Sequence, residues 1–405
     1  MLKNMLIGQS GGPTAVINAS LQGAIEKGRT SESIGTVFGM INGIEGFLND
    51  HYIDITSIDA RENMHLLSTT PGAYLGSCRY RLPEDLSSPV YRNLFCKFHE
   101  LNIGYVFYIG GNDSMDTVEK LSRASAIKGE DIRFIGIPKT IDNDLVLTDH
   151  TPGFGSAAKF VATTVREIGI DAAVYDNKPS VTIVEIMGRH AGWLTGASAL
   201  ARQTPLDNPV LIYLPETDFY EGTFLYQVEK ALSKRNNIVV CISEGIHNAS
   251  GELICEHSAS THKDVFGHTQ LAGAGKYLEN LVKEKLGVKV RSVELNVCQR
   301  CSSHHLSETD RQEALSAGRE AVRLALDGAT AQMVAFHRVS DVPYKMELIS
   351  EPVSEICNAE KKVPLEWIAD NEADVTKKFL QYVSPLIQGE VEIPMKDGLP
   401  EFVFR

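Results

Sequence analysis

The most constraining feature of the sequence is a repeated unit in which a short β-rich run ends in a glycine-rich turn and then opens into a segment of helical spacing. The first unit has a strand at 6–8, a turn at 9–14 (QSGGPT) and a helix that begins at Pro13 or Thr14, with Gly28 past its end. Four apolar residues recur on one face of this helix: Val16, Ile17, Leu21 and Ile25. Such alternation favours a parallel sheet with helices on both faces, where ligands bind beyond the carboxyl ends of the strands.

A second unit follows the same plan, with a strand at 105–109, a turn at 110–114 (GGNDS) and a helix that turns Val118 and Leu121 inward. Four further strands are expected at 134–137, 181–186, 210–214 and 238–242. The tail from about Val353 onward is richer in Lys, Glu and Pro, and we expect it to pack as an extension. At roughly 150 residues per domain, a chain of this length predicts two or three domains.

Composition restricts the partners. The 405 residues have a net charge of -13 and no apolar run near the length of about 18 residues that a membrane span requires. An acidic surface counts against nucleic acids and anionic membranes as partners. Taken alone, the charge also counts against small anionic ligands, but the local field inside a cleft decides that question.

The cysteines and the start of the chain indicate a compartment. The seven cysteines are odd in number and scattered, and no apolar secretory segment precedes the first strand, so we expect a cytoplasmic protein with reduced thiols. Cys298 and Cys301 have the spacing of half a zinc site. No second pair stands at a matching distance, which disfavours a structural metal with four ligands.

Two of the glycine turns have the composition of a phosphate cradle. Glycine lets backbone N–H groups approach an oxyanion, and the N-terminus of the following helix favours negative charge. Tight strand-to-helix turns have the same composition, so neither turn decides the question alone. Neither fits GxxxxGK[ST] or GxGxxG, which disfavours a P-loop protein and a nicotinamide dehydrogenase.

The loop at 138–144 (PKTIDND) carries the most chemistry. It directly follows a strand, so it belongs at the same sheet edge as the glycine turns, and it brings two carboxylates, a hydroxyl and an ammonium. Phosphoryl transfer needs a proton acceptor, cations and a rigid anion cradle. Turn chemistry is the alternative for Asp142 and Asp144, because Asp and Asn cap turns through their own backbone.

Six segments together resemble the 6-phosphofructokinase family, in order and spacing, over most of the chain. They are 10–12 (SGG), 75–79 (LGSCR), 110–114, 138–144, 187–189 (MGR) and 299–300 (QR). The subgroup that uses pyrophosphate as phosphoryl donor is the closer likeness, because 148–158 and 188–193 are written as that subgroup writes them. The resemblance implies an α/β phosphofructokinase fold of two Rossmann-like lobes with mostly parallel sheets. It implies a donor lobe at 1–152 plus about 304–350, and a sugar-phosphate lobe at 153–303 plus about 351–405, including a C-terminal extension.

Donor choice has a physical interpretation at two positions. ATP-using relatives carry glycine where this chain has Asp113 and Lys139, which leaves room for the nucleotide's α-phosphate. Asp113 would repel that phosphate, and Lys139 would place an ammonium on the shorter donor. The alternative is that Asp113 merely caps the following helix.

The resemblance also implies roles in catalysis. Asp142 is the expected general base for the 1-hydroxyl of fructose 6-phosphate, Asp144 orients that hydroxyl or the metal, and Thr140 touches the transferred group beside Lys139. Mg²⁺ would bridge the donor oxygens, held by Asp113 and Asn112. Many relatives have aspartate at the position of Asn112, so Asp113 or Asp142 is expected to contribute more to the metal. The expected donor-binding residues are Gly11, Gly12, Arg79, Gly111, Asp113 and Ser114.

On the sugar side, the resemblance implies a second set of contacts: Met187, Gly188, Arg189, Glu244, Arg291 and Arg300. Arg291 and Arg300 match two arginines that grip the 6-phosphate, and the counterpart of Arg291 reaches in from a neighbouring subunit, which implies a homodimer or homotetramer. We expect Arg79, Lys139, Arg189, Arg291 and Arg300 to converge on one cleft. Ser180 replaces a phosphate-binding arginine of short bacterial enzymes, and Val297 replaces a histidine or tyrosine. A longer phosphosugar such as sedoheptulose 7-phosphate therefore stays open as a substrate.

The resulting hypothesis is a reversible, Mg²⁺-dependent transfer from pyrophosphate to fructose 6-phosphate in glycolysis, giving fructose 1,6-bisphosphate and phosphate. One alternative is an ATP-dependent 6-phosphofructokinase, which glycines at 113 and 139 would have favoured. Another is a non-catalytic regulatory subunit of the same fold, against which Asp142 counts.

Overall fold

The computed structural model describes residues 2–58, 62–174, 176–204, 207–257 and 273–405. The chain forms two compact units, the first Met1–Ser156, Arg300–Glu360 and Ile387–Arg405, the second Ala157–Gln299 and Lys361–Leu386. Residues 351–360 and 387–405 therefore pack with the first unit, whereas the sequence placed them with the sugar-phosphate lobe. Val353 and Ile356 explain the first of these differences, because both are fully buried in the core of the first unit.

A seven-stranded sheet forms the centre of the first unit, in the order β11-β10-β5-β4-β1-β2-β3. Its strands are β1 (Lys3–Gln9), β2 (Ile34–Met40), β3 (Tyr52–Asp54), β4 (Ile103–Gly110), β5 (Arg133–Pro138), β10 (Gln332–Asp341) and β11 (Tyr344–Pro352). The strands from β10 to β2 run parallel, while β3 and β11 pair antiparallel at the two edges. The turns after β1, β4 and β5 therefore meet at one edge.

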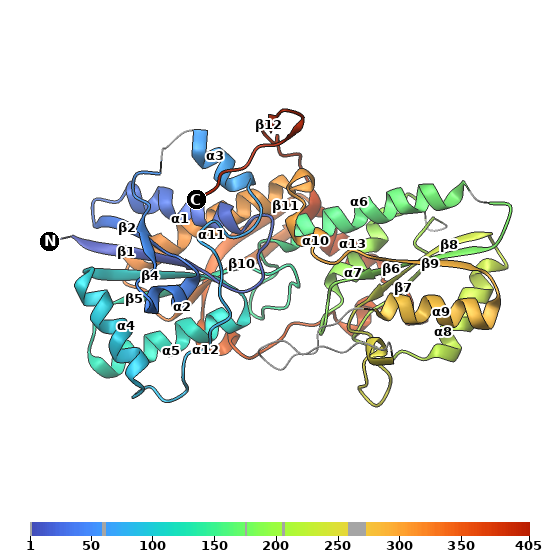
Figure 1. The fold of residues 1–405 in the computed structure, drawn as a ribbon, viewed down its shortest axis with the longest axis horizontal. Coiled ribbons are helices and arrows are strands. Elements are labelled where there is room, and N and C mark those ends of the chain that lie inside the picture. The colour runs from blue at the N-terminus through green and yellow to red at the C-terminus, as the bar shows by residue number, and fades with distance from the viewer. Residues whose placement is uncertain (1, 59–61, 175, 205–206, 258–272) are drawn as a thin grey trace. The chain divides into compact units, whose positions relative to one another are not determined.

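Helices cover both faces of this sheet (Figure 1). On one face lie α1 (Ile17–Arg29) and α11 (Glu308–Leu326); on the other lie α2 (Gly43–Leu48), α4 (Pro89–Glu100), α5 (Asn112–Lys128) and α12 (Val353–Ile356). Successive residues of β4 enter different cores: Phe107 packs in the cluster that contains α1, and Tyr108 in the cluster that contains α5. This is the alternation that a strand buried on both faces requires.

Four parallel strands form the sheet of the second unit, in the order β7-β8-β6-β9. They are β6 (Ser180–Ile186), β7 (Leu211–Tyr213), β8 (Asn237–Ser243) and β9 (Lys289–Glu294). The long helix α6 (Phe154–Ala173) covers one face, and α8 (Glu221–Leu232) and α9 (Ala274–Leu286) cover the opposite face (Figure 1). Two shorter helices complete the unit, α7 (Trp193–Ala197) and α13 (Lys377–Val383).

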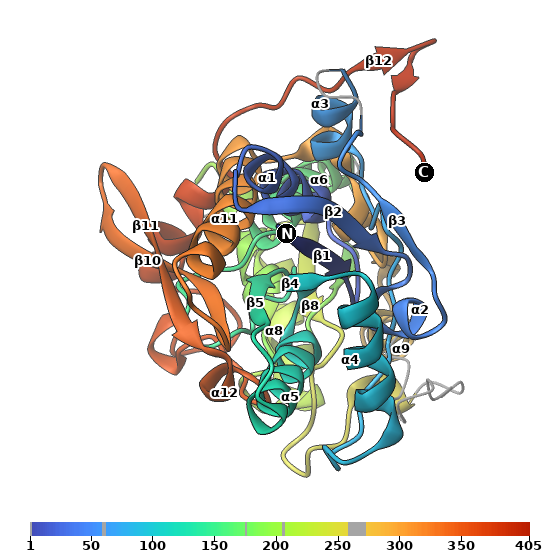
Figure 2. The ribbon, with the colours of Figure 1, turned by 90° about the vertical axis from the view of Figure 1, so that its left-hand side faces the viewer.

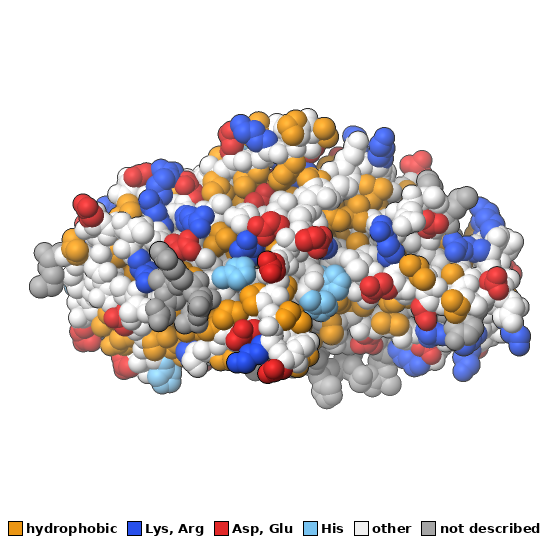
Figure 3. Space-filling view, turned by 90° about the horizontal axis from the view of Figure 1, so that it is seen from above, with side chains coloured by type: hydrophobic (Ala, Val, Ile, Leu, Met, Phe, Trp, Pro, Cys, Tyr) orange, Lys and Arg blue, Asp and Glu red, His pale blue; other side chains and the backbone are white. Residues whose placement is uncertain are grey.

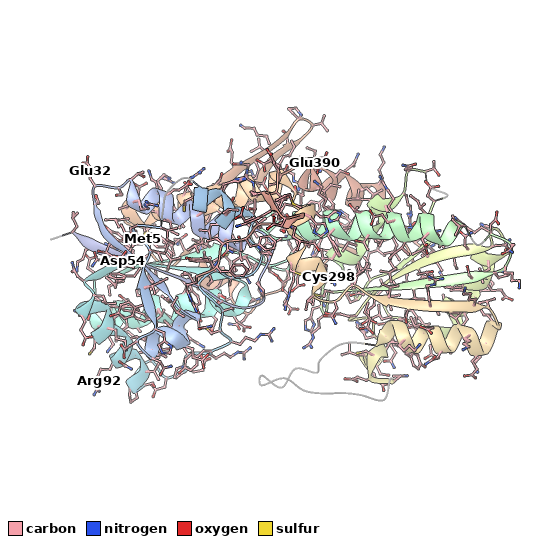
Figure 4. The ribbon with its side chains drawn as sticks, turned by 45° about the horizontal axis from the view of Figure 1, so that its top comes forward. Met5, Glu32, Asp54, Arg92, Cys298 and Glu390 are labelled. Atoms are coloured by element: carbon pink, nitrogen blue, oxygen red, sulfur yellow. The ribbon has the colours of Figure 1, made fainter. Side chains whose placement is uncertain are left out.

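Short elements make up the rest of the described chain. They are α3 (Glu62–Thr69), α10 (Cys298–Cys301), β12 (Met395–Lys396), β13 (Leu399–Pro400) and 3₁₀ turns at Ser198–Ala201, Ile254–His257, Ser303–His305, Leu365–Trp367 and Ser384–Ile387. The small β12–β13 hairpin lies near the C-terminus on the same side as α3 (Figure 2), where Val403 N–H donates to Thr70 Oγ1 at 3.0 Å. Figure 4 labels Cys298 at the start of α10 and Met5 within the sheet of the first unit, where Met5 is fully buried.

All six predicted strands are confirmed: five are longer than predicted, by one to four residues, and the one predicted at 210–214 is shorter, Leu211–Tyr213. The predicted start of the first helix is wrong, because α1 begins at Ile17, and Gly28 lies inside its last turn instead of past its end. A Cβ at Gly28 would stand 2.7 Å from Met5 Sδ, so close packing on β1 explains this glycine.

The described helices include none long and apolar enough to cross a membrane. On the face drawn in Figure 3, basic and acidic side chains are interspersed. Although the net charge of the chain is -13, that face is therefore not uniformly acidic.

Candidate active site

A buried lysine joins two of the predicted segments in the first unit. Lys139, the first residue after β5, is only 2% exposed, and its Nζ donates a hydrogen bond to the carbonyl oxygen of Gly12 at 2.6 Å. Its backbone N–H donates to the carbonyl of Gly110 at 3.0 Å. One residue therefore holds the loop at 138–144 against the turns after β1 and β4, as the strand order requires.

Two arginines of the first unit accompany this ammonium. The pKa of Lys139 is lowered to about 8, mainly by burial and also by Arg300 and Arg79, while Asp142 and Asp144 partly offset this effect. Gly11 has a φ of +74°, and a Cβ built there would stand 3.4 Å from Lys139 Nζ, while a Cβ on Gly12 would stand 3.1 Å from Arg300 Nη1. Glycine thus lets the backbone of this turn lie directly beneath two cations.

Part of the expected phosphate cradle is already occupied. The N–H of Gly11 donates to Cys78 O at 3.2 Å, and Ser77 Oγ donates to Gly11 O at 2.6 Å. Ser114 is 3% exposed and its hydroxyl is bonded to that of Ser10. Side-chain cations, more than the Gly11 N–H, therefore provide the positive charge at this turn. The hydroxyl of Ser114 joins the turns after β1 and β4, and this bond disfavours the predicted contact of Ser114 with the donor.

The loop 138–144 alternates between buried and accessible positions. Ile141 and Asn143 are buried, whereas Asp142 and Asp144 are half-buried. Asp142 N–H donates to Thr140 Oγ1 at 3.1 Å, which is the turn chemistry expected of such a loop. Both carboxylates remain partly accessible beside Lys139, so the turn does not prevent them from contacting a substrate.

The backbone of the loop is held from behind. Thr151 Oγ1 donates to Thr140 O at 2.8 Å, and Thr140 also forms a parallel bridge with Gly153. Gly153 N–H donates in turn to Asp310, a carboxylate 2% exposed whose pKa is raised to about 6 by burial. The segment after the loop therefore fixes where Asp142 and Asp144 stand.

The expected metal ligands at the start of α5 behave differently from the prediction. Asn112 uses both ends of its amide on backbone far away in sequence: Nδ2 donates to Ala359 O at 2.6 Å, and Oδ1 accepts from Asn358 N–H at 2.5 Å. Its predicted part in holding Mg²⁺ is disfavoured, because both polar atoms are engaged. Asp113 is three-quarters exposed and forms an ion pair with Arg81 at 3.0 Å.

Asp113 does not cap the helix through its side chain. The N-cap of α5 is Gly111, and no side-chain cap hydrogen bond is made there. A Cβ on Gly111 would stand 3.6 Å from the carbonyl oxygen of Lys139, so the start of α5 lies next to the loop. The helix-cap alternative for Asp113 therefore loses support.

The side chains at this edge of the sheet fit Mg²⁺ only if a bound phosphate supplies further ligands. Among the described residues, no group of three or more His, Cys, Asp or Glu side chains could hold a metal ion. The carboxylates of Asp113, Asp142 and Asp144 are nevertheless hard oxygen donors, and Mg²⁺ is usually bound through one or two carboxylates together with substrate phosphates and water. The residues present fit a metal that arrives with its phosphate ligand.

The predicted sugar residues of the second unit gather at the carboxyl edge of its sheet. Gly188, two residues beyond β6, donates its N–H to Glu244 Oε1 at 3.3 Å, and Glu244 N–H donates to Ile186 O at 2.9 Å. Met187 N–H donates to Gln299 Oε1 at 3.3 Å. Arg189 continues the same segment, half-buried.

Arg291 lies elsewhere in the second unit. It faces Thr182 in the β6–β9 register, which places it roughly 16 Å along the strand from Met187 at about 3.3 Å per residue. It is paired with Asp171 at 3.8 Å and lines a cavity of about 340 Å³ that also contains Lys178, Ser180 and Lys289. Arg291 and Arg189 therefore do not meet within one chain, and their convergence across neighbouring subunits stays a prediction.

Two features were missed from the sequence. One is the bond of Asn112 to the segment at 358–359, and the other is the buried network around His150. The Cys298–Cys301 pair lies in α10, and all seven cysteines are present without disulfides.

The fold defines an α/β protein with two largely parallel sheets, and a buried ammonium lies at the turn after the first strand. A family model described as Phosphofructokinase matches residues 4–295. A relative from Xanthomonas campestris pv. campestris, named pyrophosphate--fructose 6-phosphate 1-phosphotransferase, is 40% identical over 403 residues, which are 99% of this chain and 95% of the relative. The chain therefore belongs to the phosphofructokinase family.

Further relatives extend this comparison. The crystal structure of a pyrophosphate-dependent phosphofructokinase from Nitrosospira multiformis has a TM-score of 0.90 and 36% identity, covering 100% of this chain and 96% of that one. A relative from Alkalicoccus urumqiensis named sulfofructose kinase is 34% identical over 91% of this chain and 92% of its own length.

Proposed function

We propose that the protein transfers a phosphoryl group from pyrophosphate to the 1-hydroxyl of fructose 6-phosphate in a reversible, Mg²⁺-dependent reaction. The observation that carries this proposal is the buried ammonium of Lys139 beside Gly11, Gly12 and Arg300, with Asp142 and Asp144 on the same loop. The relatives named for this reaction cover nearly the whole chain at about 40% identity, which supports the same substrates here.

Asp142 is the proposed general base. Its carboxylate takes the proton of the 1-hydroxyl while that oxygen attacks the terminal phosphorus of the donor, and the leaving phosphate departs with the electron pair of the broken P–O bond. Asp144 orients the hydroxyl, and Thr140 contacts the transferred group. Lys139, Arg79 and Arg300 offset the charge on the phosphate oxygens.

Magnesium completes the proposed charge balance. Asp113 and Asp142 are the residues we assign to it, with the donor phosphates and water as its remaining ligands. When bound, the ion neutralises negative charge on the donor oxygens.

Pyrophosphate is favoured over ATP by two side chains. Asp113 is exposed at the start of α5, where its carboxylate would repel an additional phosphate group. Lys139 adds a cation for a donor that lacks a nucleotide. An ATP-dependent enzyme of this family is the competing proposal, and a regulatory subunit without activity is the other.

The sugar substrate has a second candidate. Ser180 provides no guanidinium in the cavity that holds Arg291, so the grip on the distal anion differs from that implied for short bacterial enzymes. Lys178 and Lys289 line the same cavity and can supply replacement charge. The relative named sulfofructose kinase makes a sugar with a distal sulfonate the alternative to test beside sedoheptulose 7-phosphate.

A coupled assay at matched donor concentrations tests the proposal. With Mg²⁺ and fructose 6-phosphate, we expect turnover with pyrophosphate and little turnover with ATP. Turnover with ATP and little with pyrophosphate would instead indicate an ATP-dependent enzyme. No turnover with any donor–sugar pair would favour a regulatory subunit. Repeating the assay with sedoheptulose 7-phosphate and a sulfonated fructose ranks the sugars. We further propose a cytoplasmic homo-oligomer in which Arg291 serves a neighbouring subunit, and sedimentation in solution measures the assembly.

A further inference from the structure

We infer that Asn112 is a positioning residue that couples donor binding at α5 to the segment after the sugar-binding residues, through a connector formed by residues 358–363. The chain passes from the first unit to the second between Glu360 and Lys361, so this connector spans that passage. The inference rests on the proposed function, because it assumes that a phosphate donor binds at the start of α5.

The first end of the connector is clamped by Asn112. Its amide satisfies both the N–H of Asn358 and the carbonyl of Ala359, at 2.5 and 2.6 Å. Asn358 has a φ of +64°, a conformation that asparagine tolerates better than most residues. Asn112 is the first residue of α5, between Gly111 and Asp113, so the clamp is part of the turn on which the donor is expected to bind.

The second end is held by residues that directly follow the sugar-binding segment. Trp193 Nε1 donates to Lys361 O at 3.0 Å, and the ammonium of Lys361 lies over the Trp193 ring, 5.3 Å from its centroid. The Oε1 of Glu216 accepts from both Val363 N–H at 2.9 Å and Gly192 N–H at 2.8 Å. The backbone of the connector and that of the 187–193 segment thus share one carboxylate.

This second anchor is rigid. A Cβ on Gly192 would stand 2.7 Å from Glu216 Oε2, so glycine permits the close approach. Trp193 is 3% exposed and packs against Phe379 and Tyr382, with ring centroids 5.9 and 5.1 Å away. A displacement of the connector therefore changes the surroundings of a buried indole.

The connector is short between its two anchors. Only Glu360 lies between Ala359 and Lys361, whose carbonyl oxygens are both hydrogen-bonded. Two residue steps span at most about 7 Å when fully extended. We therefore expect a shift of the Asn112 amide, when an anion binds beside it, to displace Lys361 and so to change the surroundings of Trp193.

Intrinsic fluorescence can read this coupling without a label. The chain has two tryptophans, and Trp193 and Trp367 lie 6.0 Å apart with their rings at 90°. Pyrophosphate with Mg²⁺ is titrated into the full-length protein while tryptophan emission and, separately, the heat of binding are recorded. The wild type is expected to change emission with the same Kd that calorimetry measures.

Asn112→Ala is expected to lose most of the emission change, while calorimetry still detects the binding of pyrophosphate. Asn112→Asp retains an acceptor for the Asn358 N–H and is expected to keep part of the change. Asn4→Ala is the matched control, because Asn4 makes the same kind of two-ended clamp, to Leu101 O at 2.7 Å and from Thr36 N–H at 2.8 Å. It should leave the emission change intact.

Three results would overturn the inference: binding without an emission change in the wild type, a full emission change in Asn112→Ala, or an equal loss in Asn4→Ala. If pyrophosphate is not the donor, the result is different, because calorimetry of the wild type would then detect no binding of pyrophosphate. In that case Mg²⁺-ATP replaces pyrophosphate in the same titration, and the same three results test the coupling role of Asn112.

Discussion

The Nζ of Lys139 donates to the carbonyl oxygen of Gly12 at 2.6 Å, so an ammonium that follows β5 supports the turn that follows β1. Two elements far apart in the sequence are thereby held together at one edge of the sheet. Burial makes this arrangement costly, because it lowers the pKa of the ammonium to about 8, and the carboxylates of Asp142 and Asp144 only partly offset that effect.

The lowered pKa predicts how donor use depends on pH. Below about pH 8 Lys139 is charged in the free protein, and as pH rises through 8 it loses the charge that attracts pyrophosphate. We expect kcat/KM for pyrophosphate to fall above that pH. Lys139→Arg keeps its charge throughout, so any activity it retains should lack this decline; an identical decline in both proteins would contradict the assignment.

A rise in pH is expected to change stability through Lys139 in the opposite direction to its effect on donor use. Its pKa in the folded protein, about 8, lies below the ordinary 10.5, so the unfolded chain binds the proton more tightly between these values. The contribution of Lys139 to the free energy of unfolding should therefore rise from pH 8 to pH 10.5. Urea unfolding of the wild type and of Lys139→Met across this range measures the difference.

Asp142→Asn should remove the proton acceptor while keeping the loop. The hydrogen bond from the backbone N–H of residue 142 to Thr140 Oγ1 does not involve the carboxylate, so the fold should persist. We expect kcat to fall by about a hundredfold or more. Asp131→Asn, an exposed carboxylate of the same unit paired with Arg133, is the control, and a near-normal kcat in Asp142→Asn would rule out Asp142 as the base.

Asp113→Gly should relax the discrimination against ATP. Removal of this carboxylate takes away the repulsion of an α-phosphate and breaks the ion pair of Asp113 with Arg81 at 3.0 Å. The ratio of kcat/KM for ATP to that for pyrophosphate should rise, by about tenfold if one charge contact of roughly 1.4 kcal/mol is involved. If ATP use stays undetectable even with Lys139→Gly added, donor exclusion lies elsewhere.

Much of the site could be predicted because its residues are adjacent to strands that are themselves easy to recognise. The runs that became β4 and β5 are apolar throughout, so the loops that follow them had to share one edge. By contrast, β9 was missed, since it alternates charged and partly buried residues at the edge of its sheet. Without β9, the register that separates Arg291 from Met187 could not be foreseen.

The role of Asn112 could not be predicted for a different reason. Its partners, Asn358 and Ala359, stand almost 250 positions later in the chain, and a turn-forming GGNDS sequence carries no trace of them. The bond of Ser114 to Ser10 was not foreseen for a similar reason, because it depends on the pairing of β1 with β4. Local composition indicates which turns can bind phosphate, but tertiary contacts decide which of their polar atoms remain accessible.

His150 is 1% exposed and belongs to the segment that follows the loop at 138–144. Its Nδ1 lies 2.8 Å from Asp149 Oδ1 and its Nε2 lies 2.6 Å from Glu313 Oε2. Burial alone would lower its pKa, but Glu313 and Asp149 outweigh burial and raise it to about 9. Arg338 and Tyr344 complete the network, bonded to Asp149 and Glu313 respectively.

Because the pKa of His150 in the folded protein exceeds the ordinary 6.5, its stabilising effect is fully present below pH 6.5 and is lost as pH rises through 9. The shift corresponds to about 3 kcal/mol in the free energy of unfolding. His150→Gln should lower stability at pH 6 and flatten its decline between pH 7 and 9 in urea unfolding, as expected when one member of a buried charge network is removed. His337→Gln, on the exposed face of β10, should do neither. An unchanged decline in His150→Gln would mean that another group titrates.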